Sequence, residues 1–373
     1  MLIIGTFEAF FLLLLILSKR QKRVPDLFLG FIFFTFGLSI GFTWLEIYNA
    51  DNGYPIPWAL NTSWLFLFLH GPGLWLYIKS LSISGFRFRP VYLLHFAPFV
   101  ILFIIQYITF YSLDPSTRIQ LVISDTFQEQ LFYKLSVLGV GMSTLTYYLW
   151  GLKQIRDRRR RLMNNFSRID NKDLEWLRIL IIVSLVVYGV NVALFNLDLV
   201  VDIAPYHVLM LFAYTFASLY ILVLGFFGLQ QGNVFLSAAV EPAMRNPESD
   251  QPPLRVKDEK SEFINKLLRF MENEKPFLAP ELTLARLARL MNVGPEFLSG
   301  VMNHDLDHSF FDFVNKYRVE EFKLQSLSAE NSHLSIMGIA YECGFNSKAA
   351  FYRAFRRYEN QSPSDYITRL RKK

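Results

Sequence analysis

The chain has 373 residues, of which 52% are hydrophobic and 16% aromatic, and its formal net charge is +6. This composition is too apolar for a soluble protein with one ordinary core, and the surplus is concentrated in the first 228 residues. The single cysteine, Cys343, excludes an intramolecular disulfide and any metal site built from several cysteines.

Seven long apolar stretches occupy the N-terminal part of the chain. Each is close to the length of about 20 residues that a helix needs to cross the hydrocarbon core of a bilayer, where a helix pairs its own backbone groups. We therefore predict a seven-helix transmembrane sensor module over residues 1–228, with seven buried helices of a soluble core as the lesser alternative. The stretches are Leu2–Leu17, Leu27–Tyr48, Trp58–Ile78, Val91–Ser112, Leu131–Gly151, Leu177–Leu197 and Tyr206–Gly228.

Basic residues are distributed unevenly between these stretches. Alternate loops carry fifteen Lys and Arg, whereas the other loops carry only Arg118. Because cytoplasmic loops are enriched in Lys and Arg, we expect a multi-pass protein of a bacterial inner membrane, with its N-terminus outside and its C-terminal part in the cytoplasm. The run Arg158–Arg161 is interpreted as a topology determinant attracted to acidic headgroups, with contact to DNA phosphates as the alternative. The basic loops are 18–26, 79–90 and 152–176, and the others are 49–57, 113–130 and 198–205.

Polar side chains inside or beside the predicted spans are candidates for sensing, because an unpaired polar group is costly in hydrocarbon. We predict a ligand pocket that opens outward and involves at least one of Glu46, Lys134 and His207. His70 is a further candidate in the third span, next to a Gly-Pro-Gly sequence that should kink or break the helix. The alternatives are hydrogen bonding between helices and, for Lys134, a side chain that reaches the interface.

The composition changes after Gly228. Residues 229–257 contain four prolines and show no sustained periodicity, so we predict a flexible cytoplasmic linker. Residues 258–373 show helical periodicity without an alternating strand pattern, which predicts an all-α domain with its own core. An amphipathic helix should stop before Pro276, and further helices are expected near 281–291, 295–303, 308–326, 335–343, 347–358 and 363–371.

The segment 282–303 has the pattern of a helix-turn-helix. Such a motif needs an apolar first helix, a tight turn, and a second helix that is apolar on its inner face only. Pro295 suits the first position of the second helix. The inward residues are Leu284, Leu287, Ala288, Phe297, Leu298 and Val301, and the turn is Asn292-Val293-Gly294.

The segment 335–358 repeats the pattern. Asn346 is expected to cap the second helix of this motif, and Asn360 tolerates the left-handed conformation that the turn after it requires. The inward residues are Ile336, Ile339, Ala340, Phe351 and Phe355, and the turn is Cys343-Gly344-Phe345.

The stretch from Met271 to Tyr366 resembles the AraC-type DNA-binding domain, particularly the subgroup attached to multi-span membrane modules. The resemblance implies an all-α, AraC-like domain over 258–373, with two helix-turn-helix motifs whose recognition helices meet successive major-groove faces on one side of the duplex. It does not cover the membrane half. The sequences that carry it are EKPFLAPELTLARLA, FLSGVMN, SFFDFVNKYRVEE, IAYECGFNSKAAFYRAF and SPSDYI.

The outward faces of the two recognition helices are the predicted DNA contacts. The first helix has Gly300 and Met302 and lacks the basic residue that many members carry, so we expect the second helix to dominate affinity. Residues 258–373 hold 17 basic and 16 acidic residues, so affinity depends on local placement. Arg356 and Arg357 should hold the DNA backbone. The predicted contacts are Glu296, Ser299 and Asn303 in the first helix, and Ser347, Lys348, Tyr352, Arg353 and Arg356 in the second.

We predict a membrane-embedded one-component transcriptional regulator that binds double-stranded DNA under the control of the sensor. The lipid bilayer, an unknown signal molecule, a second copy of the chain and RNA polymerase are the further partners. No catalytic motif, cofactor or metal site is expected. The competing hypothesis is a membrane transporter or enzyme whose helix-turn-helix domain serves regulation or protein interaction. Proteolytic release within the linker is a third alternative.

Overall fold

The computed structural model describes residues 1–83, 85–124, 130–169, 174–201, 206–234, 257–331 and 333–371. The chain divides into two compact units, of which unit 1 contains Met1–Arg156 and Leu174–Ala239, and unit 2 contains Asp157–Asp173 and Val240–Lys373. Over the described residues the regular structure is helical, apart from one isolated antiparallel bridge between Phe166 and Thr283. The all-α class predicted from the sequence is therefore confirmed.

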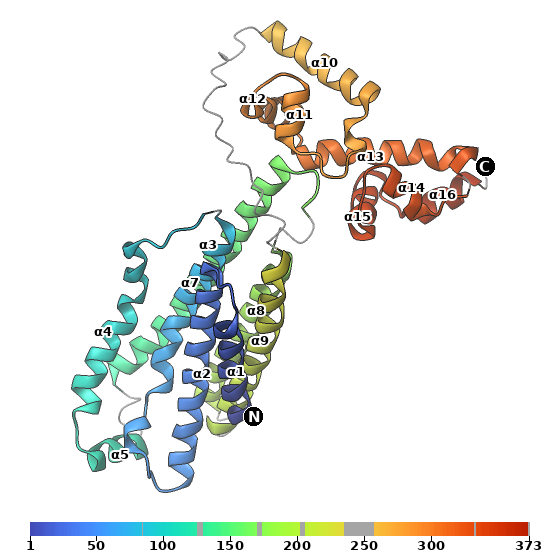
Figure 1. The fold of residues 1–373 in the computed structure, drawn as a ribbon. Helices are drawn as coiled ribbons and strands as arrows, with labels where there is room; N and C mark the ends of the chain where they lie inside the picture. The colour runs from blue at the N-terminus through green and yellow to red at the C-terminus, as the bar shows by residue number, and fades with distance from the viewer. Residues whose placement is uncertain are drawn as a thin grey trace. The chain divides into compact units, whose positions relative to one another are not determined.

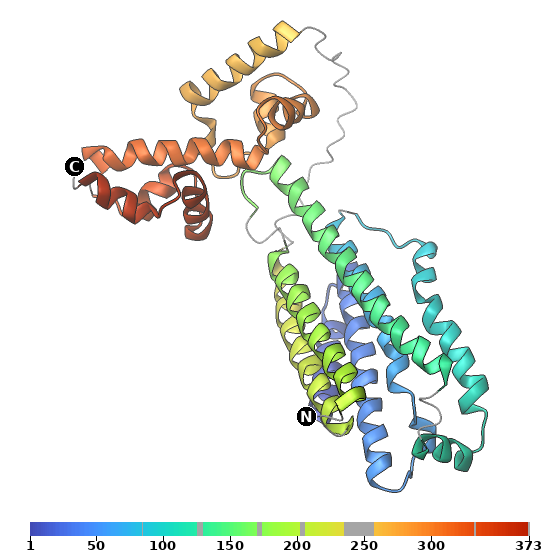
Figure 2. The ribbon, with the colours of Figure 1, turned by 180° about the vertical axis from the view of Figure 1, so that it is seen from behind.

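Unit 1 is a bundle of helices (Figures 1 and 2). All seven apolar stretches predicted from the sequence contain helix, although the third and fourth begin with 3-10 turns. The α-helices are α1 (Leu2–Ser18), α2 (Val24–Asp51), α3 (Leu67–Ser82), α4 (Ala97–Gln106), α5 (Pro115–Ile123), α7 (Leu131–Asn165), α8 (Glu175–Val201) and α9 (Tyr206–Val234). The short turns are η1 (Pro57–Ala59), η2 (Ser63–Phe66), η3 (Pro90–Phe96) and the π-helical η4 (Tyr107–Tyr111).

Four helical segments among the described residues are long and apolar enough to cross a membrane, as judged by length and composition. Large apolar side chains on the bundle are exposed, including Phe7 at 67%, Ile104 at 51% and Leu138 at 60%. Exposed apolar surface of this kind fits contact with lipid tails better than contact with water. The four segments are Val24–Asp51, Pro90–Tyr111, Leu131–Asn165 and Leu211–Leu229, and the apolar helix Leu2–Ser18 is shorter.

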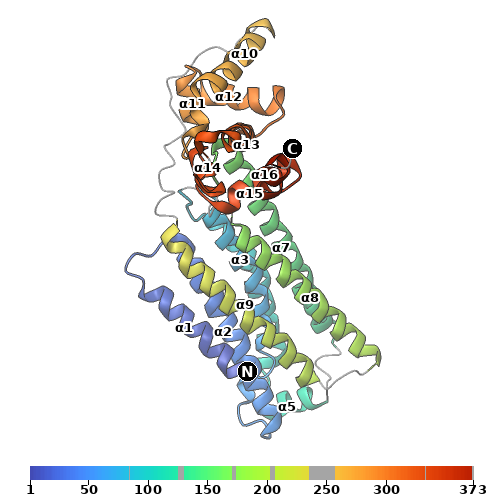
Figure 3. The ribbon, with the colours of Figure 1, turned by 90° about the vertical axis from the view of Figure 1, so that its right-hand side faces the viewer.

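Helices α1, α2 and α9 pack closely together, and α3 packs against α2 (Figure 3). Helix α3 continues through Pro72, so of the two predicted effects of this sequence, a kink or a break, the break does not occur. The glycines on either side of Pro72 are explained by packing, because each leaves room for the aromatic ring of a neighbouring residue. A Cβ at Gly71 would lie 2.7 Å from Tyr147, and one at Gly73 would lie 3.1 Å from Phe31.

Unit 2 contains the two helix-turn-helix motifs, joined by the long helix α13 (Phe310–Leu327). One hydrophobic core, around Leu267, Leu287 and Leu298, includes the first part of α13. A second core, around Phe322, Phe351 and Phe355, includes the later part of α13. The other elements are α10 (Lys257–Glu274), η5 (Pro276–Leu278), α11 (Leu284–Leu290), α12 (Pro295–Gly300), η6 (Val301–Asp305), η7 (Ala329–Asn331), α14 (Ile336–Glu342), α15 (Lys348–Glu359) and α16 (Pro363–Arg371).

The boundaries of the two units differ from those expected from the sequence. The predicted linker, 229–257, falls mostly outside the described residues, and α9 extends beyond Gly228 to Val234. Residues Asp157–Asp173, which the sequence places between two spans, belong by their contacts to unit 2. Helix α7 therefore contains residues of both units.

Candidate nucleic-acid interface

The first helix-turn-helix consists of α11 and α12. Thr283 caps α11 by accepting a hydrogen bond from the Arg286 N–H at 3.2 Å. The turn is tight because Asn292 adopts a left-handed conformation, with φ 55°, and the Val293 N–H donates to the Ala288 carbonyl at 3.0 Å. The predicted inward residues Leu284, Leu287, Ala288, Leu298 and Val301 are buried, and Phe297 is partly buried.

The first recognition helix is shorter than the sequence predicts. Regular α-helix ends at Gly300, and a π-helical turn follows over Val301–Asp305. Asn303, expected to read bases, donates through Nδ2 to the Ser299 carbonyl at 2.8 Å and to Ser299 Oγ at 3.1 Å. Glu296 is exposed, whereas Ser299 and Asn303 are half-buried. Ser299 and Asn303, two of the three residues of this helix that are predicted to contact DNA, are therefore hydrogen-bonded to each other.

The second helix-turn-helix consists of α14 and α15. Gly344 makes the turn with φ 88°, and the Phe345 N–H donates to the Ala340 carbonyl at 3.1 Å. The N-cap of α15 is Ser347, whose hydroxyl accepts from the Ala350 N–H at 3.1 Å, so the prediction of Asn346 as the cap is wrong. Both residue types are good caps, and the helix begins one residue later than the sequence pattern places it.

One face of α15 carries the basic residues predicted to meet DNA. Lys348, Arg353 and Arg356 are exposed, and Tyr352 is half-buried. The Lys348 ammonium lies 5.6 Å from the centre of the Tyr352 ring. The opposite face is buried through Phe351, Ala354 and Phe355, and Asn360 ends the helix in the expected left-handed conformation. These side chains give the second recognition helix a positively charged, solvent-exposed surface.

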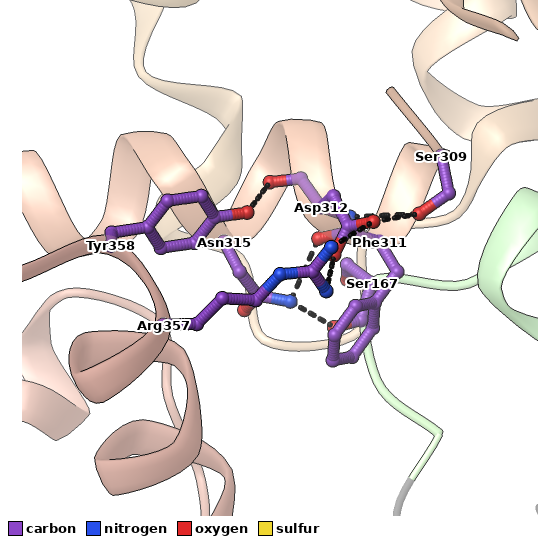
Figure 4. Close-up of polar contacts among 7 residues, drawn as sticks. All are labelled: Ser167, Ser309, Phe311, Asp312, Asn315, Arg357 and Tyr358. Carbon is purple, nitrogen blue, oxygen red and sulfur yellow. Dashed lines mark hydrogen bonds and ion pairs between the residues drawn. The ribbon is translucent and has the colours of Figure 1, made fainter. Parts of the chain in front are cut away.

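The end of α15 is held on α13 by Asp312 (Figure 4). Arg357 Nη1 lies 2.5 Å from Asp312 Oδ1, and the Tyr358 hydroxyl donates to the Asp312 carbonyl at 2.9 Å. Ser309 caps α13 and also bonds to the Asp312 carboxylate. The structure gives Arg357 an intramolecular partner, although the sequence pattern had suggested a contact with the DNA backbone.

A buried arginine joins the two halves of unit 2. Arg318, in the middle of α13, is 2% exposed and donates to the Phe277 carbonyl at 2.8 Å and the Ala279 carbonyl at 2.9 Å. Burial lowers the pKa of Arg318 to about 10, so the guanidinium remains charged at neutral pH. A Cβ at Gly344 would lie 3.0 Å from Arg318 Nε, which places the second turn against the same group.

The sequence reasoning missed Arg318, although a signal was present. Val314, Arg318 and Phe322 are spaced four residues apart and therefore lie on one face of α13. Val314 and Phe322 are both fully buried. An arginine in register with two such residues on an amphipathic helix is expected to be buried and hydrogen-bonded.

The predicted sensing residues of unit 1 have different surroundings. Glu46 accepts hydrogen bonds from the N–H groups of Thr62 and Ser63 at 2.7 and 2.9 Å, and so caps the short turn η2. The ring of His70 stacks on Phe36, with centroids 3.7 Å apart. Lys134 is exposed. The side chain of His207 lies outside the described residues.

Among the described residues of unit 1, no hydrogen bond or ion pair joins Glu46 to Lys134 or His70. Within the described residues, no three His, Cys, Asp or Glu side chains gather in a way that would hold a metal ion. Among the described residues, Glu46 is hydrogen-bonded to Thr62 and Ser63, and the Thr62 hydroxyl is bonded in turn to Tyr111 at 2.7 Å.

Comparison with known proteins supports the assignment of unit 2. A family described as "Helix-turn-helix domain", which is of the AraC type, matches residues 287–369. The chain is also 25% identical over 121 residues to the uncharacterized HTH-type transcriptional regulator YtdP of Bacillus subtilis (strain 168). That match takes in 32% of this chain and 15% of the regulator. No solved structure matches the chain significantly. Residues 287–369 therefore form an AraC-type helix-turn-helix domain.

Proposed function

We propose that this chain, with its AraC-type helix-turn-helix domain, is a membrane-embedded transcriptional regulator that binds double-stranded DNA sequence-specifically under the control of a seven-span sensor. The observation that carries the proposal is the surface of α15. Lys348, Arg353 and Arg356 are exposed on the second helix of a well-formed helix-turn-helix, which is the helix that enters the major groove in this class of motif.

The membrane part of the proposal is supported by the apolar helices and by the placement of charge. Fifteen basic residues in alternate loops against one in the others favour a cytoplasmic C-terminal domain, where bacterial DNA is accessible. In this scheme an unidentified signal acts on residues 1–228. A second copy of the chain and RNA polymerase are the partners at the promoter, and the protein itself performs no catalysis.

The first recognition helix has a secondary role in this scheme. Glu296, Ser299 and Asn303 offer no positive charge, and Asn303 is bonded to Ser299. We expect the first motif to set register and modest base preference, and Ser347, Lys348, Tyr352, Arg353 and Arg356 of the second to supply most of the affinity.

The test is genome-wide DNA occupancy of the full-length protein in its native cell, beside the variant Lys348→Ala/Arg353→Ala. We expect sharp sites in the wild type and a loss of at least tenfold in the variant, since each residue contacts a base or phosphate. The matched control is Lys266→Ala/Lys316→Ala, which removes the same charge from exposed positions on α10 and α13 and should keep its sites.

The competing function is a membrane transporter or enzyme with a regulatory appendage. It is favoured by the near balance of 17 basic and 16 acidic residues in 258–373, which limits nonspecific attraction to DNA. Absence of sites for the wild type in every growth condition would contradict the regulator. Retention of all sites by the Lys348→Ala/Arg353→Ala variant would contradict only the assigned contacts.

A further inference from the structure

The segment Phe166–Ile169, which follows α7 in the chain, is part of unit 2 and packs against the start of the first helix-turn-helix. Phe166 pairs with Thr283 in the isolated antiparallel bridge. Next to it, the Ser167 N–H donates to the Leu282 carbonyl at 3.3 Å, and Ser167 Oγ donates to the same carbonyl at 2.6 Å. We call Phe166–Ile169 the docked segment.

The docked segment also bonds to helix α13. The Ser167 carbonyl accepts from Asn315 Nδ2 at 3.3 Å (Figure 4) and from Arg318 Nη1 at 3.5 Å. Arg318 Nη2 donates to Ser167 Oγ at 3.3 Å. Ser167, Asn315 and Arg318 are each no more than 3% exposed. Polar groups buried this thoroughly need all of these partners, so the contact is an integral part of the domain interior.

Two further contacts surround this centre. Ile169 is 5% exposed, so the segment buries an apolar side chain as well as polar groups. Arg168 Nη1 lies 2.6 Å from Glu281 Oε1 at the surface. An exposed ion pair of this kind contributes little to stability, and the buried Ser167 contacts therefore define the docking.

The docked segment meets the group that connects the two helix-turn-helix motifs. Arg318 binds carbonyls that precede the first motif and lies against Gly344 in the turn of the second. Helix α13, which carries Arg318, is the element between the motifs, so its position sets the spacing of the two recognition helices. A displacement of Ser167 changes the bonding of Arg318 and hence this spacing.

We propose that the docked segment is the element through which the membrane helices control DNA binding. The chain enters it from α7 and continues to α8, so movement of these helices acts on Ser167 directly. The other connection, residues 235–256, lies outside the described residues, and its four prolines are typical of a linker sequence. This inference rests on the proposed function.

The first arm of the test measures docking and does not depend on DNA. Opposed residues of an antiparallel pair have Cα atoms about 4.5–5.5 Å apart, which suits a disulfide. The variant Phe166→Cys/Thr283→Cys, with a protease site inserted in 229–257, is oxidised in isolated membranes and cleaved. We expect the two fragments to migrate together on a denaturing gel until a reductant is added. Independent migration of the fragments, as in the two single-cysteine controls, would overturn the docking.

The second arm measures transmission. Ser167→Lys places a cation beside Arg318 at a site that is 2% exposed, and should expel the segment while leaving the Phe277 and Ala279 bonds intact. We expect DNA occupancy in the full-length protein to change at least fivefold, with Cys343 still protected from alkylation. The matched variant Ser167→Thr retains the hydroxyl and should resemble the wild type.

The outcomes separate the two proposals. Occupancy of Ser167→Lys within twofold of the wild type would overturn transmission through the docked segment and leave the regulator in place. A changed occupancy together with rapid alkylation of Cys343 would also overturn transmission through the docked segment, because the second motif would then be unfolded. A wild type without any DNA sites would overturn the regulator and this inference together, whatever the disulfide arm showed.

Discussion

At the scale of single residues, the turn of the second helix-turn-helix depends on the absence of a side chain at Gly344. Its φ of 88° is a left-handed value that other residues adopt at a cost. A Cβ there would also lie 2.5 Å from the Phe277 carbonyl oxygen and 2.8 Å from that of Leu278. The position therefore combines a conformational requirement with a close approach between the second turn and the segment before the first motif.

We expect Gly344→Ala to lower the free energy of unfolding of unit 2 by about 3 kcal/mol, from backbone strain and steric overlap. Urea unfolding of the full-length protein in detergent, followed by alkylation of the buried Cys343, measures the change in unit 2, because all six tryptophans lie in unit 1. Gly338→Ala is the matched control because a Cβ at Gly338 meets only ordinary contacts, at 3.4 Å and beyond. A variant Gly344→Ala as stable as Gly338→Ala would contradict the argument.

Gly300 presents the opposite case. A Cβ at this position meets nothing within 4 Å, and the residue ends the α-helical part of the first recognition helix. We expect Gly300→Lys to tighten DNA binding about threefold to tenfold by adding a phosphate contact to a helix that has none. The slope of log affinity against log salt should steepen by about 0.9. Titration of a labelled operator at several salt concentrations measures both, and Gly300→Ala, expected to bind like the wild type, separates charge from helix propensity.

At the scale of elements, the reactivity of Cys343 reports whether the second helix-turn-helix is folded. Cys343 is fully buried between α14 and α15, and burial raises the pKa of its thiol to about 12. The thiolate is the reactive form, so the folded motif protects the cysteine in two ways. Because the folded pKa lies above the unfolded value of 9.0, this contribution to stability is complete below pH 9 and is lost as the pH rises through 12.

We therefore expect Cys343 to react with an alkylating reagent at pH 8 only as fast as the second motif opens. The rate in the wild type should be at least a hundredfold below that of the urea-unfolded chain. The reason is that opening a core element costs several kcal/mol of free energy. Mass spectrometry of the alkylated protein over time gives the rate. Gly344→Ala should accelerate alkylation, and rapid alkylation of the wild type would show that the motif does not protect its core.

The helices of unit 2 were largely predictable, and the exceptions are instructive. Periodicity and turn residues located α13 to α16 to within two residues, because apolar spacing and caps are local signals. The π-helical turn after Gly300 was not predictable, since the burial of both Val301 and Met302 depends on the rest of the core. The choice of Ser347 over Asn346 as the cap was not predictable either, since both residue types are good caps and stand next to each other.

At the scale of the whole molecule, the sequence indicated two parts but not the route of the chain between them. Bonds from Ser167 to Leu282 and Arg318 join positions more than a hundred residues apart, and no local pattern encodes such pairs. The same limit applies to Glu46. Its role in sensing stays a prediction, and its bonds to the N–H groups of Thr62 and Ser63 join positions 16 and 17 residues apart that no local pattern pairs.

The number of spans decides whether the DNA-binding domain can reach DNA. With seven spans and the N-terminus outside, the loop after α2 is external and the segment after α1 is cytoplasmic. We expect Asn52→Cys to react with a membrane-impermeant maleimide in intact cells, and Arg20→Cys to react only after permeabilisation. Both positions are exposed, and the buried native Cys343 should stay unlabelled in folded protein.

The positive-inside distribution gives the physical reason for this expectation, because the segment that carries Arg20 belongs to the basic set and the loop that carries Asn52 has no Lys or Arg. The reverse labelling pattern would place the first span in the opposite orientation. With seven spans, the AraC-type domain would then lie outside the cell, away from the chromosome, and α15 could not act on it. Labelling of both positions in intact cells would mean that α2 does not cross the bilayer, and the span count would have to be revised together with the proposed route of the signal.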